Sequence, residues 1–485
     1  MTRHRDALLA VFALWPALAR AQEAQEVGPA ATDRSTPVRT DAALAFQLPP
    51  APVHSMNLAE ALAYARAHQP AVLAAVARIR AQAEQANVPR SQWYPTVGVT
   101  AQLFAATTNN TTGTYVSPGQ MDIPRIGATR GTATGSWSPY ASTFVGLGVN
   151  QELFDFGRIA AQAAAADALT DVERQRTRSV TLDVTFNVEE AYFAVFAAKA
   201  ILKASQDAYE RSRVHRELAN AGVSAGMRSP IELTRANADL AQFDIARVRA
   251  QGGLSTAQTV FAATVGVPDP ELDVAAAPPA PAELPDLSAA IQRAEAADPR
   301  LHAAIAQLRA AELDTRAIRA ETRPNLALTG TISGRAGGAP ASGTGTIPDS
   351  GGWVPSVPNW DIGVVLSWPL FDPTVSARAS ASRAREFVRT EDVSLVREEE
   401  TALIREAYSA VDVARTVVPG LLRAVEAARA NYDQADARFK AGLGTSVELA
   451  DAENLRTQAE IQLVLGEFEL ARARAAFGRT IAEGL

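Results

Sequence analysis

The feature that most constrains the fold of this chain is an internal duplication. Two copies occupy residues 56–265 and 287–485, on either side of a proline-rich stretch at 266–286. Two motifs recur in the same order, Leu-Phe-Asp at 153–155 and 370–372, and Glu-Ala-Tyr at 190–192 and 406–408. Because repeated motifs in conserved order indicate a repeated supersecondary unit, each copy is expected to fold alike, with the proline-rich stretch as a linker.

Each copy is predicted to contain two strands and one long helical hairpin. Alternation of apolar and polar or small residues predicts strands at 96–105, 144–154, 325–333 and 361–371. Apolar or small residues that step by three and four predict hairpin helices over about 158–219, 230–265, 376–440 and 446–482. The first helix of each hairpin far exceeds the average of about 11–12 residues. Pro419-Gly420 is expected to interrupt and kink the helix over 376–440.

The N-terminal residues are predicted to direct export. Residues 1–21 combine a basic start, an apolar run and Ala19-Arg20-Ala21, which is typical of a cleavable signal peptide. Residues 22–55 are polar and contain proline, so we expect a flexible segment. Beyond residue 21 no apolar run approaches the roughly 20 residues of a membrane helix. A crossing of a membrane is therefore expected to use strands.

Composition excludes several classes of protein. The chain has no cysteine, so we expect no disulfide, no thiolate metal site and no lipoprotein anchor. Its net charge of -7, without a basic face, argues against a nucleic-acid partner. The five histidines lack metal-ligand spacing, and no phosphate-binding loop or nucleophile elbow occurs. The chain is therefore expected to be no enzyme and to use no cofactor.

Four strands of about ten residues suit a membrane but cannot close a barrel. An open sheet edge is not viable in lipid, because its backbone groups would lack hydrogen-bond partners. A barrel shared by several copies of the chain removes the edges. Since the two strands of each copy enter and leave on one side, both hairpins extend from the same end. The expected fold is an α+β membrane protein, a shared β-barrel continued by a barrel of antiparallel helices.

With these features the chain resembles the outer membrane efflux protein family, the TolC-like trimeric channels of Gram-negative bacteria. The Leu-Phe-Asp and Glu-Ala-Tyr pairs and the glycine-containing turns before Glu232 and Glu448 carry the resemblance, which covers nearly all of 56–485. It implies a homotrimer with a twelve-stranded β-barrel in outer-membrane lipid and a long α-helical coiled-coil barrel in the periplasm.

The resemblance also implies a function. Such channels are passive exit ducts of tripartite efflux or type I secretion systems, gated at the periplasmic tip. They dock a periplasmic adaptor and an inner-membrane transporter of the RND or ABC type. The alternative from the residues alone is a soluble periplasmic coiled-coil scaffold, in which the four strands would form a sheet outside the membrane.

The candidate gate lies at the turns of the two hairpins. Glu448 and Asp451 share a helix face at i and i+3, and helix capping alone would explain acids at this position. The resemblance implies that they form acidic rings around the closed mouth. For Glu232 and Arg235 a solvated face is the alternative; the resemblance implies contacts between hairpins, with Arg235 pairing Glu448 or Asp451. Phe439 stands where the family often has tyrosine, so a hydroxyl latch is not expected there.

The same turns are candidate docking tips. Their glycines allow positive φ at helix ends, which explains them without any function. The resemblance implies that the turns receive the hairpins of the adaptor. The residues concerned are Gly222, Val223, Gly226, Met227, Gly442, Leu443 and Gly444.

Overall fold

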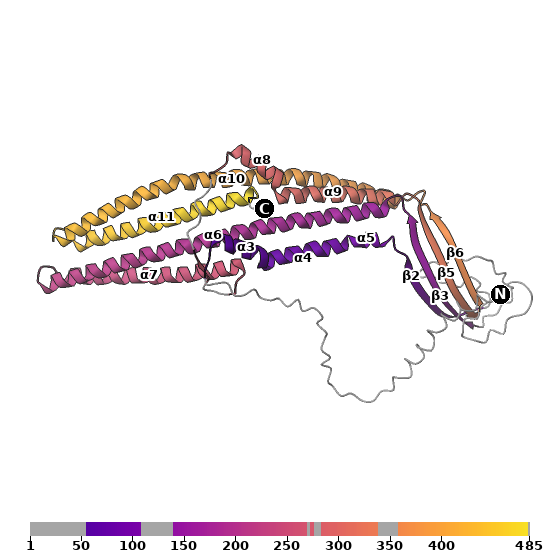
Figure 1. Ribbon diagram of the computed structural model, residues 1–485, viewed down its shortest axis with the longest axis horizontal. Coiled ribbons are helices and arrows are strands. Elements are labelled where there is room, and N and C mark those ends of the chain that lie inside the picture. Colours follow the sequence, from indigo (N-terminus) through magenta and orange to yellow (C-terminus); the bar gives the residue numbers. More distant parts are fainter. Residues whose placement is uncertain (1–54, 108–138, 269–271, 276–282, 338–356, 484–485) are drawn as a thin grey trace, which may run out of the picture. The chain divides into compact units, whose positions relative to one another are not determined.

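The computed structural model describes residues 55–107, 139–268, 272–275, 283–337 and 357–483. The predicted signal peptide at 1–21 and all but the last residue of the segment at 22–55 lie outside the described residues. Residues 52–485 form one compact unit. In this unit the sheet lies at one end and the turns of the two hairpins lie at the other (Figure 1).

Four strands form one antiparallel sheet in the order β2-β3-β5-β6, so that β3 of the first copy pairs with β5 of the second. Three of the strands run beyond their predicted ends, but β6 was expected to reach residue 371 and ends at Ser367. Pro369 follows, and a proline has no backbone N–H to donate to a ladder. The strands are β2 (Thr96–Thr107), β3 (Pro139–Phe154), β5 (Asn325–Gly337) and β6 (Val357–Ser367).

One face of the sheet carries exposed apolar side chains. Val97, Val99, Ile362, Val364 and Leu366 all expose more than half of their surface. Strands β2 and β6 are the two edges of the sheet in this chain. The sheet therefore presents both an apolar surface and unpaired edges, which a single chain in water would not leave uncovered.

The two hairpins contain the longest helices. Helix α6 has 67 residues and α10 has 68, so each extends for roughly 100 Å at 1.5 Å per residue. Among the described helices none is apolar enough over sufficient length to span a membrane. The hairpin helices are α6 (Arg158–Ser224), α7 (Pro230–Val265), α10 (Pro373–Lys440) and α11 (Ser446–Thr480).

Shorter elements pack around the middle of these hairpins. Strands β1 and β4 pair in parallel, so the linker is held beside the residues before the first helix. The Asn57 side chain accepts the backbone N–H of Glu60 and so caps α3, and the backbone N–H of Asn57 donates to the Glu60 carboxylate. The elements are β1 (Ser55–Met56), α3 (Leu58–His68), α4 (Pro70–Gln85), α5 (Asn87–Ser91), β4 (Asp273–Val274), α8 (Leu287–Ala297) and α9 (Pro299–Ala320).

The Leu-Phe-Asp motif lies where the second strand of each copy leads into the long helix. The Asp155 carboxylate accepts the backbone N–H of Gly157 at 3.0 Å and that of Ile159 at 2.5 Å. The Asp372 carboxylate accepts the N–H of Thr374 at 2.9 Å. Each aspartate thus satisfies N–H groups that have no partner inside the helix. The motif recurs because both copies must turn a strand into a helix.

Each copy has its own core where the short helices cross the hairpin. In the first, Tyr192 and Phe261 meet edge to face with their ring centroids 5.7 Å apart. In the second, Tyr408 and Phe477 meet the same way at 5.9 Å. The first core also includes Met56 and residues of the linker, and it buries more side chains than the second. The Glu-Ala-Tyr motif therefore places the tyrosine of each core.

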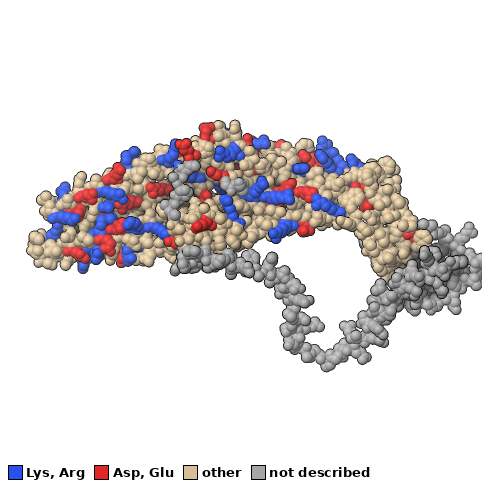
Figure 2. Space-filling view, in the orientation of Figure 1, with Lys and Arg blue, Asp and Glu red and all other residues tan. Residues whose placement is uncertain are grey.

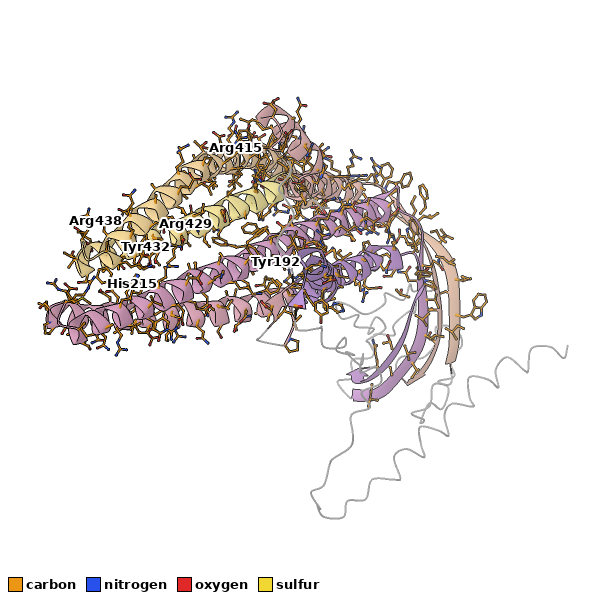
Figure 3. The ribbon with its side chains drawn as sticks, turned by 60° about the vertical axis from the view of Figure 1, so that its left-hand side comes forward. Tyr192, His215, Arg415, Arg429, Tyr432 and Arg438 are labelled. Atoms are coloured by element: carbon orange, nitrogen blue, oxygen red, sulfur yellow. The ribbon has the colours of Figure 1, made fainter. Side chains whose placement is uncertain are left out.

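The apolar or small residues that step by three and four along α10 form a seam, as predicted. The predicted interruption at Pro419-Gly420 is wrong. From Ile404 to Tyr432 the seam residues are buried or half-buried while their neighbours are exposed. The helix runs unbroken through Pro419 and bends near Arg415 (Figure 3). A Cβ on Gly466 of α11 would overlap Leu421, so the two helices pack closely beside the proline. This packing holds the helix together although one backbone hydrogen bond is missing.

Candidate functional site

The turns of the two hairpins have the same backbone. In the first tip, residues 222–229, the Gly222 carbonyl accepts the N–H groups of Met227 and Arg228 at 2.9 and 3.2 Å. In the second tip, residues 438–445, the Arg438 carbonyl accepts those of Leu443 and Gly444 at 2.9 and 3.0 Å. Equivalent positions are 216 residues apart throughout. The tips are therefore two versions of one helix-terminating turn.

Only two of the four predicted turn glycines adopt positive φ. Gly226 has φ 70° and Gly442 has φ 76°, which is the left-handed region. Gly222 and Gly444 lie outside that region, so the prediction that they serve this conformation is wrong. Their lack of a side chain leaves room for neighbouring atoms instead. A Cβ on Gly222 would lie 2.6 Å from Cδ of Arg228, and a Cβ on Gly444 would lie 3.1 Å from the Phe439 nitrogen.

Arg228 connects the first tip to the second hairpin. Its Nη2 donates to the Phe439 carbonyl oxygen at 2.7 Å, and its guanidinium carbon lies 3.8 Å from the centre of the Phe439 ring. Its Nη1 donates to Glu232 at 2.9 Å. The Arg228 side chain is only 16 % exposed, so the charge is partly desolvated and these contacts gain strength. Sequence reasoning missed Arg228; its i,i+4 spacing to Glu232 was the available signal.

Phe439, a predicted gate residue, is buried. It packs in one cluster with Tyr432, Leu449 and Ala452 of the second hairpin. It has no hydroxyl, as noted from the sequence, but the contact between hairpins uses its carbonyl oxygen and its ring instead. Glu232, the predicted residue of the first tip, enters the same contact as the partner of Arg228.

The predicted acidic pair lies at the start of α11. The Glu448 carboxylate is about half exposed and lies 4.0 Å from Arg438 of its own hairpin, rather than beside Arg235. Burial, and then the charge of Asp451, raises the pKa of Asp239 on α7, while Arg235 lowers it. The charges of Asp451 and Arg235 therefore both act on Asp239.

The candidate docking residues differ in their exposure to solvent. Met227 and Leu443 occupy equivalent positions and are 80 % and 77 % exposed. Gly222 is buried, and Val223 is partly buried. Each tip thus presents one large apolar side chain to solvent. Single exposed apolar residues are common, so the matched pair at the ends of both hairpins is the informative observation.

A buried ion pair joins the hairpins farther from the tips. Arg211 of α6 donates to Glu453 of α11 through Nε at 2.9 Å and Nη2 at 2.7 Å, and Thr457 also donates to Glu453. The Glu453 side chain is 2 % exposed. Burial opposes the charge of Arg211, but the hydrogen bond and the charge of Glu453 raise its pKa overall. Arg211 and Glu453 thus form a bidentate contact, although they lie 242 residues apart in the sequence.

Tyr432 and His215 lie between the two hairpins beside this ion pair (Figure 3). The Tyr432 hydroxyl is 3.1 Å from Nε2 of His215. Burial, followed by the charge of Glu453, raises the pKa of Tyr432 to about 12, so the hydroxyl keeps its proton. Near the tips the first hairpin therefore contributes Arg211, Arg228 and His215 to the contact, and the second contributes Glu453, Tyr432 and the Phe439 carbonyl.

Within the part of the chain that the structure describes, no three His, Asp or Glu side chains are grouped to hold a metal ion. The contact between the hairpins consists of ion pairs, hydrogen bonds and ring packing, which can hold two structural elements together.

Comparison with known proteins identifies similar chains. The family model described as "Outer membrane efflux protein" matches residues 61–267 and 290–481, one segment in each copy. Protein CyaE of Bordetella pertussis is 26 % identical over 285 residues, which cover 57 % of this chain. The match spans about half the length of that relative, 54 %.

Several solved structures have the same fold. The outer-membrane channel OprN is 22 % identical with a TM-score of 0.69, covering 88 % of this chain and 90 % of its own. The CmeC outer membrane channel of Campylobacter jejuni is 14 % identical with a TM-score of 0.70, covering 95 % and 94 %. The outer membrane protein VceC of Vibrio cholerae is 17 % identical with a TM-score of 0.67, covering 88 % and 96 %.

Proposed function

Because the chain belongs to the outer membrane efflux protein family, we propose that it is the passive exit duct of a tripartite efflux or type I secretion system. The expected fold class and location are confirmed with the family: an internally duplicated α+β channel protein of the Gram-negative outer membrane, whose helices extend into the periplasm. The duct would conduct substrates that an inner-membrane transporter delivers.

The open sheet is the observation that carries this proposal. Its edges β2 and β6 need partners, and its exposed apolar face needs lipid. Figure 2 shows charged side chains over the helices and few over the sheet, as a membrane-inserted sheet requires. Three copies would provide twelve strands, in which β6 of one copy pairs with β2 of the next.

The helices support the same assembly. Helix α11 packs against α6, so that among the described hairpin helices α7 and α10 lie on the two outer sides. Both carry exposed apolar residues, Ile245 and Val248 on α7 and Val413 and Val417 on α10. We infer that α7 of one copy meets α10 of the next, so a homotrimer closes a ring of hairpins.

We infer the partners of the duct from the exposed apolar side chains at the tips. Met227 and Leu443 would fit apolar positions on a periplasmic adaptor, which links the duct to an inner-membrane transporter of the RND or ABC type. The contact of Arg228 with Phe439 holds the two hairpins of one copy together at this end. We infer that this contact keeps the tip closed, and that Glu448 and Asp451 line its mouth.

Detergent dependence and conductance test the duct. The full chain is expected to require detergent for release from membranes and to form discrete conductance steps in planar bilayers. Cross-linking is expected to stop at three copies. Release of the folded chain by buffer or high salt alone would support the soluble scaffold and contradict the duct.

The closed tip is tested by a matched pair of arginines. Arg228→Ala removes a charged hydrogen bond and a cation–π contact, together worth about 2 kcal/mol per copy. It is expected to raise bilayer conductance severalfold. Arg438→Ala, at an exposed arginine of the second tip, is expected to change conductance little. Equal effects of the two variants would contradict a closing role for Arg228.

A further inference from the structure

His215 lies in the contact between the hairpins, on α6, with a side chain that is 14 % exposed. Its ring Nε2 faces two groups of α10, the Tyr432 hydroxyl at 3.1 Å and Oδ1 of Asp436 at 3.6 Å. A neutral ring that carries its proton on Nδ1 accepts the hydrogen bond of the Tyr432 hydroxyl at Nε2. The other described histidines lie on α3 and α9, away from the tips.

Protonation of His215 would disturb this arrangement. A proton on Nε2 removes the acceptor of the Tyr432 hydroxyl. It also places a positive charge in a poorly solvated site that already contains a paired Arg211 and Lys440. Asp436 attracts that charge through Oδ1, while its Oδ2 is 2.7 Å from Lys440. The charged and titratable groups that face the ring from the four helices are Arg211, Asp239, Tyr432, Asp436, Lys440 and Glu453.

Burial, the largest influence, lowers the pKa of His215 in spite of Asp436 and Glu453, and Lys440 and Arg211 lower it further. If the hairpins separate, water reaches the ring and its pKa returns toward the ordinary value of about 6.5. The separated state therefore binds the proton more tightly than the closed state. The contact is complete above about pH 6.5 and weakens as the pH falls below that value.

A small cavity adjoins the ring. Its volume is about 20 Å³, which is room for one water molecule, and its polar lining includes Ser212, Asp239 and Ser446. The His215 ring also lies 6.4 Å from the ring of Phe439, which Arg228 contacts from the first tip. The group that titrates therefore packs against the residue on which closure depends.

We propose that His215 makes closure of the tips sensitive to pH, so that acidification of the periplasm loosens the contact between the two hairpins and favours opening. This inference rests on the proposed function, because it regulates the closed tip described above. The bistable element is the packing of α6 on α10 and α11, and the proton is the ligand that favours its separated state.

Distance measurement between the tips tests the proposal. The chain has no cysteine, so Met227→Cys with Leu443→Cys places spin labels at these two positions alone. In the purified full-length assembly, lowering the pH from 7.5 to 5.5 is expected to shift the distances to longer values. His215→Asn keeps an acceptor for Tyr432 but cannot titrate, so the shift is expected to be lost. His302→Asn, outside the contact, is expected to retain it.

A shift that persists in His215→Asn, or no shift in the parent chain, overturns the proposal. Should His215→Asn fail to assemble, Asp436→Asn provides the second test. It removes a carboxylate that raises the pKa of His215, so the shift is expected to need more acid; an unchanged midpoint contradicts the proposal. A chain that forms conducting trimers without any pH shift would leave the proposed duct intact and remove this inference alone.

Discussion

The two hairpins of this chain share a backbone and differ in their charges. Helices α6 and α10 differ by one residue in length, and the tips repeat the same turn with φ 70° and 76° at equivalent glycines. Where the hairpins meet, however, the first supplies Arg211 and Arg228, and the second supplies Glu453 and the Phe439 carbonyl. The equivalents of Arg211 and Glu453 in the other hairpin are the uncharged Ala427 and Asn237, so this ion pair arose from divergence of the two copies. Elsewhere along α6 and α11 the polarity is reversed, since Arg472 and Arg479 of α11 pair with Glu190 and Asp183 of α6.

The cores show a second difference between the copies. The first core includes β1 and β4, through Met56 and Val274, whereas the second is a smaller cluster of α8, α10 and α11 residues. The linker thus completes one core and leaves the other without an equivalent cover. Both copies therefore have the aromatic pair and the turn, but they differ in the size of their cores and in the groups they bring to the contact between the hairpins.

Truncating the equivalent phenylalanines tests the unequal cores, and the effect is expected to be the largest. Phe261→Ala removes a fully buried ring and is expected to cost about 5 kcal/mol, the upper end for such truncations. Phe477→Ala is expected to cost about 3 kcal/mol, because its partner Tyr408 is only half-buried. Thermal unfolding of the purified protein, followed by circular dichroism, measures both. Equal losses would show that the copies are equally stable.

Equivalent positions of the two returning helices test the charge asymmetry. Glu453→Ala leaves the Arg211 charge without its partner and is expected to cost about 3 kcal/mol, with some of the charge still solvated. The equivalent Asn237 accepts a hydrogen bond from Arg216 at the surface, so Asn237→Ala is expected to cost less than about 1 kcal/mol. Unfolding of both variants in urea gives the comparison.

The control for this pair is a double variant. Arg211→Leu with Glu453→Leu removes both charges, and it is expected to recover most of the loss. If the double variant is as unstable as Glu453→Ala, packing rather than the stranded charge explains the effect.

The acidic residues of the second tip carry the smallest expected effect. Glu448→Gln with Asp451→Asn is expected to raise leak and to reduce the preference for cations in planar bilayers by less than about tenfold, because exposed charges are screened by salt. The equivalent change in the first tip, Glu232→Gln with Arg235→Gln, leaves the net charge unchanged and is expected to leave ion preference unchanged. Unaltered preference in the first variant would remove the acidic pair from the mouth.

Local chemistry made most of the fold predictable. The helix expected over 230–265 has those bounds in the structure, because Pro230 suits a first helical position and Gly266 ends the helix with φ 85°. The seam of α10 followed from its spacing, and the duplication from repeated motifs. The interruption expected at Pro419 was wrong, because the effect of this proline depends on the close contact of Leu421 with Gly466 in another helix.

The contacts of the candidate site were less predictable. Glu232 and Phe439 were expected at the tips as candidate gate residues; Arg228 donates to the Phe439 carbonyl of the other hairpin and to Glu232 of its own hairpin. Arg228 was missed, since its acceptor lies 211 residues away and depends on how one hairpin packs against the other. Arg211 and Glu453, 242 residues apart, were missed for the same reason. Periodicity tells which face of a helix is buried, but it does not tell which residue of another helix will lie opposite.

The exchange of glycine and arginine between the tips has an evolutionary consequence. Gly222 stands below Arg228 in the first tip, and in the second the order is reversed, with Arg438 and Gly444. Side chains at both positions would collide or would push Arg228 off Phe439. A mutational route from one tip to the other therefore passes through a turn with glycine at both positions. A turn of that kind has no arginine to reach the Phe439 carbonyl, so the turn can form without the contact it now carries.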